Sequence, residues 1–502
     1  EYRCDKKSAL FYIYLLIKEE LRKEMVQVNN SLGFENFSDY QLRKCMFIQD
    51  GSIYENLLAQ LAVGSFMSDS HAKRYVEMRI APGNTMKDDL RQIQQNDEYI
   101  TGSSFAKNFR IGKDDFHYIY HFIKLKDHEL CDTDYCTEFC LQPRHNQLRK
   151  EIERQAKAIY GLMCSGHEDS KRLVGIDAAN SEICCRPEVF ARTYRYLSQP
   201  FRYADCLQPQ KLGKTYHVGE DFYDVVDGLR AIDEVLKFLG FRNGDRLGHA
   251  LSLGVDVVNY YERHNYRINA TRQVLLDNVA WLFVQSERLG CSTTVLAYLK
   301  ELYSIYYHRI FSDALAMADV FTYYQSWLLR GDSPYCYQNG DIAMLPDYSA
   351  EIMDSWNKVA FNHHLDIDNA RKNKEACRLY YMYHFNMTVR KNSAMSEVLK
   401  IKSEYRKALL TAIRDVQQHL LNQIEQLHIA IECNPSSNFK IGEFNRYDKH
   451  PIIKFNNHGL SSPHPHHAIS VSINTDDAGI FSTSLEREYS LMALALEKHE
   501  DE

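Results

Sequence analysis

The feature that most constrains this fold is a series of short apolar segments, each ending in a polar residue and mostly separated by helix-like segments. The segments end at Asp177, His217, His249 and the pair Asp476 and Asp477. Alternating strands and helices favour a parallel sheet or barrel. In an eight-stranded α/β barrel, the carboxyl ends of the strands form one rim that carries the active site. The sequence therefore predicts an α/β fold, a TIM-type (β/α)8 barrel, with these side chains on its rim.

Hydrophobic periodicity gives the expected elements. Helices are expected at 8–27, 52–70, 145–162, 225–239, 269–286 and 398–427. Strands are expected at 75–82, 116–126, 138–142, 173–179, 214–217, 246–250, 429–433 and 469–477. The polar stretch 84–113 is expected to form a loop.

Residues 262–427 interrupt the alternation with long amphipathic patterns rich in tyrosine and phenylalanine. We expect them to form a large all-helical insertion between two barrel strands. The barrel would then consist of residues 1–261 and 428–502. Aromatic surface on the insertion favours an assembly interface, and packing on its own barrel as a lid is the alternative.

Composition limits the class of protein. The chain has 502 residues, 45% of them hydrophobic, and a net charge of −7. No apolar run is long enough to span a membrane, and the charge gives no general basis for nucleic-acid binding, although a local patch stays open. Thirteen cysteines without a signal-like start favour reduced thiols and a cytoplasmic location. The chain begins at Glu1, and we expect it to be a piece of a longer protein.

The stretch His217-Val218-Gly219-Glu220 lies where a strand is expected to pass into a helix. An imidazole suits a transition metal and a carboxyl group suits proton transfer. On its own the stretch could also be a surface turn with two polar residues.

Several motifs in order support the functional reading. They are the stretches 75–82, 175–182, 217–220, 248–249, 434–438 and 472–477, with Leu485, Glu488 and Tyr489 in the final helix. Together they resemble the adenosine/AMP deaminase family of metal-dependent hydrolases, over roughly residues 30–260 and 428–500. The resemblance implies zinc-dependent hydrolytic deamination of an adenine nucleoside or nucleotide, by attack of metal-bound hydroxide at purine C6.

The resemblance also implies roles for single residues. His217 and Asp476 would be ligands of one Zn²⁺. Glu220 would protonate N1 of the purine, His249 would orient and deprotonate the attacking water, and Asp477 would hold water and purine. Substrate contacts are expected from Asp177, Asn180, Gly219 and Asp477.

The sequence departs from the family pattern in several places. The first-strand His-x-His that supplies two metal ligands is not found at its position, so the first strand is expected to be missing from this chain. The His464-Pro465-His466 stretch, followed by His467, lies in a loop before the last strand and is expected to be a solvated cluster. Asn180 stands where the family has a substrate-facing glycine, and Ala250 and Ala478 replace the usual Gly and Pro. The cysteines Cys131, Cys136 and Cys140 are expected to be ordinary thiols.

A narrower likeness concerns the insertion. The stretch Trp327–Pro334 resembles the deaminase component of the RADAR antiphage system, which implies antiviral defence, a homo-oligomer and an ATPase partner. Two other functions stay open: a different metal-dependent amidohydrolase on the same barrel, and a non-catalytic assembly scaffold.

Overall fold

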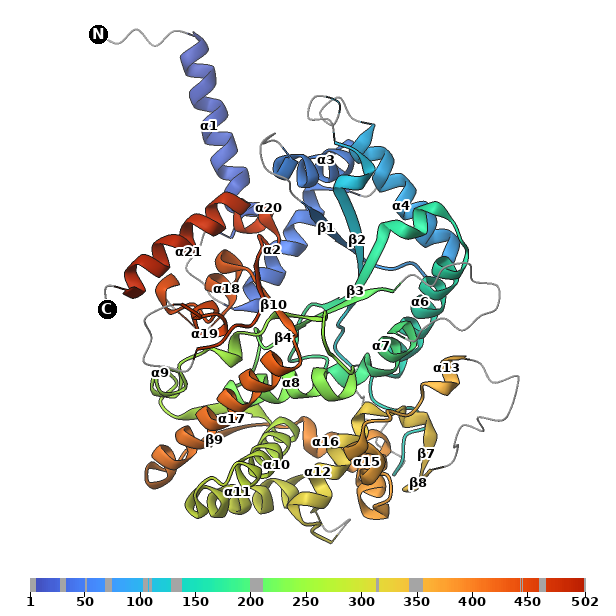
Figure 1. Ribbon diagram of the computed structural model, residues 1–502, viewed down its shortest axis with the longest axis vertical. Helices are drawn as coiled ribbons and strands as arrows, with labels where there is room; N and C mark the ends of the chain where they lie inside the picture. The colour runs from blue at the N-terminus through green and yellow to red at the C-terminus, as the bar shows by residue number, and fades with distance from the viewer. Residues whose placement is uncertain are drawn as a thin grey trace.

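A seven-stranded sheet forms the centre of the computed structural model (Figure 1). The structure describes residues 6–27, 33–49, 52–67, 75–102, 107, 111–127, 138–198, 211–312, 316–342, 355–442, 444, 446–459 and 466–500. The sheet has the order β1-β2-β3-β4-β5-β10-β11, and all neighbouring strands are parallel. The strands are β1 Val76–Ile80, β2 Phe116–Ile123, β3 Leu173–Ala179, β4 Gly213–Val218, β5 Arg246–His249, β10 Ala430–Cys433 and β11 Val471–Ile473.

This sheet confirms the predicted parallel α/β architecture. Among the described residues, β1 and β11 each pair on one side only. The strands follow one another in chain order around the sheet, which is the arrangement of a (β/α) barrel. Closure into eight strands stays a prediction.

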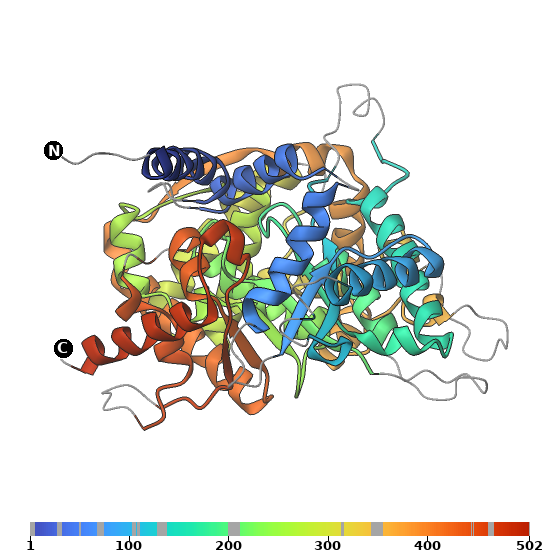
Figure 2. The same cartoon turned by 90° about the horizontal axis from the view of Figure 1, so that it is seen from above.

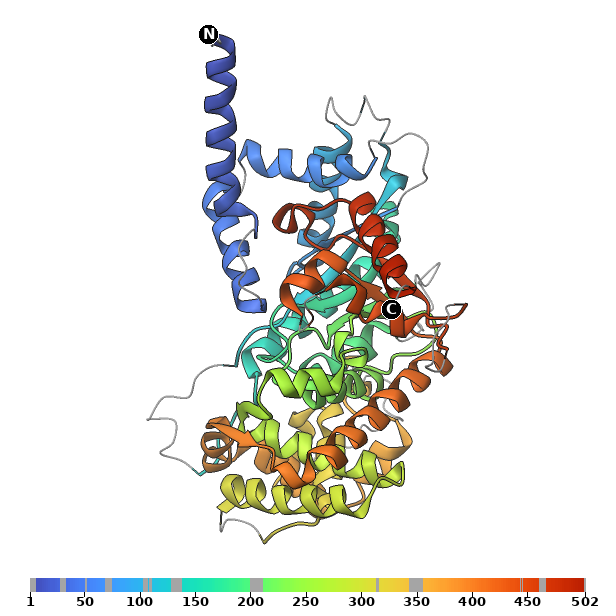
Figure 3. The ribbon, with the colours of Figure 1, turned by 90° about the vertical axis from the view of Figure 1, so that its left-hand side faces the viewer.

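Helices precede and separate the strands. They are α1 Lys6–Met25, α2 Phe34–Phe47, α3 Ile53–Met67, α4 Met86–Thr101, α6 Asn146–Cys164, α7 Ala191–Ser198, α8 Val225–Phe238 and α9 Val257–Arg263. Most lie against the sheet, whereas α1 projects away from it in Figure 1 and has no buried residue. After β10 come α18 Pro435–Ile441 and α19 Ile452–Phe455, and after β11 come α20 Ala478–Phe481 and α21 Leu485–Glu500. Figures 2 and 3 show the blue N-terminal helices beside the red C-terminal segment, and the amide of Gln27 donates to the carbonyl of Ile480 at 2.9 Å.

Two local expectations were wrong. The stretch 84–113 contains α4, whose cap Thr85 accepts a hydrogen bond from the amide of Asp88 and whose Ile93 and Ile100 are buried. A capping threonine before an amphipathic run is a helix signal that its many polar residues obscured. The expected strand at 138–142 is reduced to one bridge between Phe139 and Asn386.

The insertion lies below the sheet in Figure 1 and contains α10 to α17. Its helices are α10 Arg272–Arg288, α11 Thr293–Phe311, α12 Val320–Leu328, α13 Ser355–Lys358, α14 Leu365–Ala370, α15 Lys374–Phe385, α16 Met387–Ala394 and α17 Arg406–Gln426. It is not all-helical, which corrects the expectation from sequence. Strand β6 Arg267–Thr271 pairs antiparallel with β9 Ser396–Lys400, and β7 Tyr337–Gln338 pairs with β8 Asp341–Ile342. In β6 the buried Ile268 and Ala270 alternate with half-buried or exposed residues, which is the period of a strand.

Buried charges join the insertion to the barrel. Arg230 of α8 forms ion pairs with Asp227 and Glu234 on its own helix, and all three are buried. Glu234 accepts a hydrogen bond from the indole of Trp327 in α12 at 3.0 Å. Asp277 of α10 lies 3.8 Å from Arg230 and also binds both terminal nitrogens of Arg330, within the insertion, at 2.7 and 2.8 Å. The insertion and α8 therefore share one interior.

None of the helices that the structure describes is long and apolar enough to cross a membrane.

Candidate active site

The imidazole of His217 projects from β4 toward a buried carboxylate of β3. Its Nδ1 atom lies 3.1 Å from Oδ1 of Asp177, a residue with no exposed surface. Burial raises the pKa of Asp177, but His217 and Arg79 outweigh that effect and hold the pKa well below its usual range. The ionised carboxylate accepts a hydrogen bond from Nδ1, so Nε2 is the ring nitrogen that Asp177 does not engage. Metal-binding histidines in proteins are commonly held by a carboxylate in this way.

An arginine of β1 connects this pair to the other end of the sheet. Arg79 Nη1 lies 3.3 Å from Asp177 and 3.4 Å from His217 Nε2, while Nη2 donates to Glu432 of β10 at 2.6 Å. Arg246 of β5 also pairs with Glu432, at 3.0 Å. Sequence reasoning missed Arg79 and Glu432. The available signal was Glu432 inside the otherwise apolar β10; in β1, Arg79 alternates with Glu77 and does not stand out.

Glu220 and His249 form a second buried pair at the ends of β4 and β5. Glu220 is 6% exposed, and its Oε1 lies 3.0 Å from His249 Nδ1. Burial lowers the pKa of His249, but the Glu220 carboxylate outweighs this effect and raises the pKa to about 9. Asn438 of α18 donates to the same Glu220 oxygen at 2.7 Å. His249 and Ala250 both have positive φ angles, of 63° and 49°, which is strained backbone of the kind found at functional sites.

The turn after His217 is held by Glu182, which sequence reasoning included only as part of a motif. Its carboxylate accepts hydrogen bonds from the amides of Gly219 and Glu220, at 2.6 and 3.2 Å. Gly219 has φ 77°, and a Cβ atom there would lie 2.7 Å from Ser252 Oγ. Asn180, which directly follows β3, has φ 91°. This backbone conformation favours glycine, and glycine is the residue that the family resemblance implies at this position.

The paired aspartates after β11 point to different partners. Asp476 has φ 55° and accepts a hydrogen bond from Ser437 Oγ at 2.6 Å. Its charge raises the pKa of both Arg79 and His249, so it belongs to the same electrostatic neighbourhood as the two buried pairs. Asp477 caps α20 and accepts a hydrogen bond from Gln41 of α2 at 2.6 Å. Nothing in the sequence indicated that α2 reaches this position.

The residues that the structure describes do not bring together three or more His, Cys, Asp or Glu side chains able to hold a metal ion. His464 lies outside the described residues, as do Cys131 and Cys136. His467 was expected to be solvated, but it is 4% exposed and pairs with Glu425 at 2.8 Å. Packing of the last loop against α17 buries it. Among the described residues, no third side chain of these types joins His217 and Asp476.

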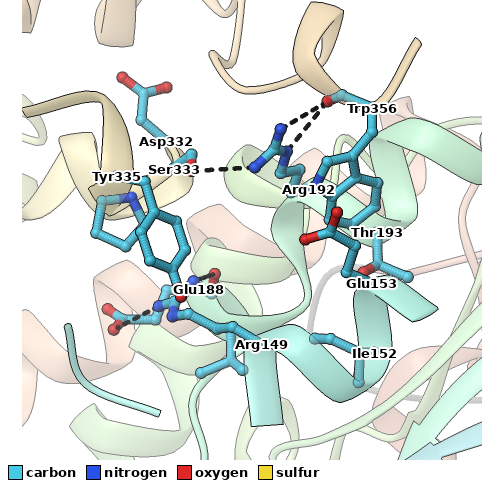
Figure 4. A pocket seen from close by; sticks show the side chains of 12 residues that line it. Arg149, Ile152, Glu153, Glu188, Arg192, Thr193, Asp332, Ser333, Tyr335 and Trp356 are labelled. Carbon is cyan, nitrogen blue, oxygen red and sulfur yellow. Dashed lines mark hydrogen bonds and ion pairs between the residues drawn. The ribbon is translucent and has the colours of Figure 1, made fainter. Parts of the chain in front are cut away.

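A separate cavity lies between the barrel and the insertion (Figure 4). It encloses about 20 Å³ and is lined by Arg149, Glu188, Arg192, Asp332 and Trp356, among others. That space is enough for a water molecule but not for a purine. Arg192 donates twice to the carbonyl of Trp356, and Arg149 pairs with Glu188 at 3.6 Å. None of the candidate rim residues lines this cavity, which is part of the interior that joins the two units.

The carboxyl-terminal part of the site matches a known family. No curated protein matches the chain. Residues 410–502 match the family model described as Adenosine deaminase. This segment contains β10, β11 and the candidate residues Asn438, Asp476 and Asp477. The segment that supplies the paired aspartates is therefore similar to the adenosine deaminase family.

Proposed function

We propose that this chain catalyses hydrolytic deamination of an adenine nucleoside or nucleotide at purine C6. The observation that carries the proposal is the buried Glu220 carboxyl group, held between His249 and Asn438 three residues after His217. The family match of residues 410–502 supports it independently. Attack at C6 of an aromatic ring is easier when N1 receives a proton, and a buried carboxyl group is suited to supply it.

The other side chains have complementary roles in this proposal. His249, beside Glu220, would orient the attacking water. Because Glu220 raises its pKa to about 9, His249 would carry a proton near neutral pH and would take the proton of the water only after passing its own to Glu220, which would then supply N1. Asp477 would hold the water and the purine, while Gly219 and Asn180 would contact the substrate. Asp177 contacts His217 and Arg79, so we assign it first to positioning the imidazole, and its expected substrate contact stays a proposal.

A zinc ion fits part of this arrangement. His217 Nε2 and the Asp476 carboxylate would each supply one ligand, and the remaining ligands would have to come from outside the described residues. When bound, zinc supplies the Lewis acidity that lowers the pKa of a coordinated water toward 7. The ionised Asp177 supports this fit because it engages Nδ1 and leaves Nε2, which Arg79 Nη1 approaches to 3.4 Å, as the nitrogen that could bind a metal.

Loss of absorbance at the adenine band tests the proposal. Adenosine, AMP and ATP are offered separately, with zinc supplied, and the product is identified as the hypoxanthine form. Conversion of one of them supports deamination. Hydrolysis of an amide or ester substrate, with no change in any adenine compound, would instead favour another metal-dependent amidohydrolase.

The biological setting is part of the proposal. We propose a cytoplasmic homo-oligomer in which the insertion contributes the interface, and an ATPase partner with a role in antiviral defence. Light scattering tests the oligomer. Co-purification with an ATPase, together with protection of cells against phage, tests the partner and the role.

A further inference from the structure

A polar cleft lies at the base of the insertion, between the end of α9 and the start of α17. It measures about 560 Å³ and is lined by Glu262, Asn265, Tyr266, Arg267, Lys400 and Arg406. The lining shares no residue with the candidate active site. A cleft of this size accommodates a small ligand, and its three cations face one carboxylate.

Two of these cations occupy an unfavourable position in the sheet. Arg267 of β6 and Lys400 of β9 are directly opposite each other in the antiparallel ladder, and both are exposed. Directly opposed residues project to the same face, and like charges at such positions destabilise the pair. Among the described residues, neither side chain forms an ion pair with a carboxylate. The β6–β9 pair therefore bears a local charge repulsion that a bound anion would relieve.

The opposite end of the β6–β9 pair shows a favourable charge arrangement. There Glu397 of β9 neutralises Arg272 at 2.6 Å and also pairs with Arg309. Two arginines thus share one carboxylate at that end. In the part of the chain that the structure describes, Arg267 and Lys400 have no such carboxylate.

Arg406 completes the cluster from the start of α17. Its guanidinium lies 3.9 Å from the centre of the Tyr266 ring, which holds the side chain against the wall of the cleft. Its Nε atom is buried and has no hydrogen-bond partner. A buried, unsatisfied donor of a charged group is costly. Three cations on one cleft, one of them with an unsatisfied donor, are suited to a multiply charged oxyanion.

We propose that this cleft binds a polyphosphate chain, carried by a nucleotide or free in solution. A compact polyanion fits better than nucleic acid, because the cations are confined to one cleft and the whole chain has a net charge of −7. Extended nucleic acids instead require a basic stripe or face. The proposal is independent of the deaminase function, since it rests only on the insertion and its junction with α9.

Isothermal titration with inorganic tripolyphosphate tests the site, since this probe has no purine for the candidate active site to recognise. The discriminating variant is Lys400→Glu, which places a carboxylate opposite Arg267. It should keep or raise the melting temperature, because an opposite-charge pair replaces a repulsive one. It should also weaken tripolyphosphate binding at least about tenfold, since a hydrogen bond to a charged group is lost and a repulsive charge is gained. Lys87→Glu on α4 makes the same charge change elsewhere and should bind like wild type.

ATP and a short single-stranded RNA complete the comparison. ATP binding that Lys400→Glu also weakens identifies a nucleotide as one source of the phosphate chain, whereas binding of tripolyphosphate alone identifies the free anion. Three results overturn the proposal: no tripolyphosphate binding, equal binding by wild type and Lys400→Glu, or tight binding of RNA alone. Stoichiometric binding by wild type with loss in Lys400→Glu supports it whether or not the chain deaminates adenine compounds.

Discussion

The Nδ1 atom of His217 lies 3.1 Å from the fully buried carboxylate of Asp177, on the neighbouring strand. This contact decides which nitrogen of the imidazole is available to a metal. It also explains why a carboxylate is retained in the sheet interior, where an unpaired charge would be strongly unfavourable.

Replacing Asp177 by Asn should lower zinc affinity about 10–100-fold, because an amide no longer fixes the imidazole as an anion does. Competition with a zinc-binding dye measures this change. Asp256→Asn, at the cap of α9, makes the same substitution away from His217 and serves as the control. Equal zinc affinity in both variants would remove Asp177 from the metal site.

The 502-residue chain should hold less than one zinc ion per molecule after dialysis. Catalytic zinc usually takes three protein ligands, and the described residues form no group of three. Elemental analysis gives the ratio. Stoichiometric zinc would mean that residues other than His217 and Asp476 complete the site. His464 and His466 would then be the first residues to mutate.

Glu220→Gln should reduce turnover by about 10²–10⁴-fold while zinc content stays close to wild type, because Glu220 is assigned to proton transfer. The amide keeps the size of the side chain and can still contact Asn438. Turnover is measured at the adenine band beside zinc content. Activity near that of wild type would exclude Glu220 as the acid.

Gly219→Ala should destabilise the chain by about 1–3 kcal/mol more than Gly244→Ala. Both glycines have positive φ, so both substitutions strain the backbone, but only the Cβ at Gly219 meets neighbours, at 2.7 Å from Ser252 Oγ and 3.0 Å from Ile232 Cδ1. Urea unfolding of the two variants gives the difference. Equal losses would show that the turn relaxes around the added methyl group.

Asp277→Ala should destabilise the protein by about 3–5 kcal/mol, because it removes the bidentate partner of the buried Arg330, whose other carboxylate contact, Glu188, is 3.9 Å away. Glu301→Ala, which breaks the exposed pair with Lys402, should change stability little. Urea unfolding compares the two. A small loss for Asp277→Ala would show that the insertion and α8 do not depend on this pair.

The same pair predicts a pH dependence. Burial raises the pKa of Asp277, but Arg330 and Arg230 outweigh it, and the net pKa is lowered. The unfolded chain then binds more protons than the folded one in acid, so the stabilisation is present above the usual pKa of about 4 and is lost as the pH falls below it. The free energy of unfolding of Asp277→Asn should therefore fall less than that of wild type as the pH drops below about 4.

Local patterns in the sequence were enough to predict the parallel sheet and the polar ends of its strands. Apolar runs ending at Asp177, His217 and His249 predicted the strands β3, β4 and β5. This was possible because side-chain periodicity and strand length are local properties. The closeness of Glu220 to His249 also followed in outline, since adjacent parallel strands end at the same edge.

Tertiary structure alone decided which side chains touch. Arg79 reaches Asp177 and Glu432 because β1, β3 and β10 face one interior, although Arg79 and Glu432 are 353 residues apart. The contact of Gln41 with Asp477 depends in the same way on where α2 packs. In the insertion, the alternation in β6 is too short to stand out from the surrounding helices, and only pairing with β9 makes it a strand. Contacts between distant segments depend on the packing of the whole chain, which no local pattern encodes.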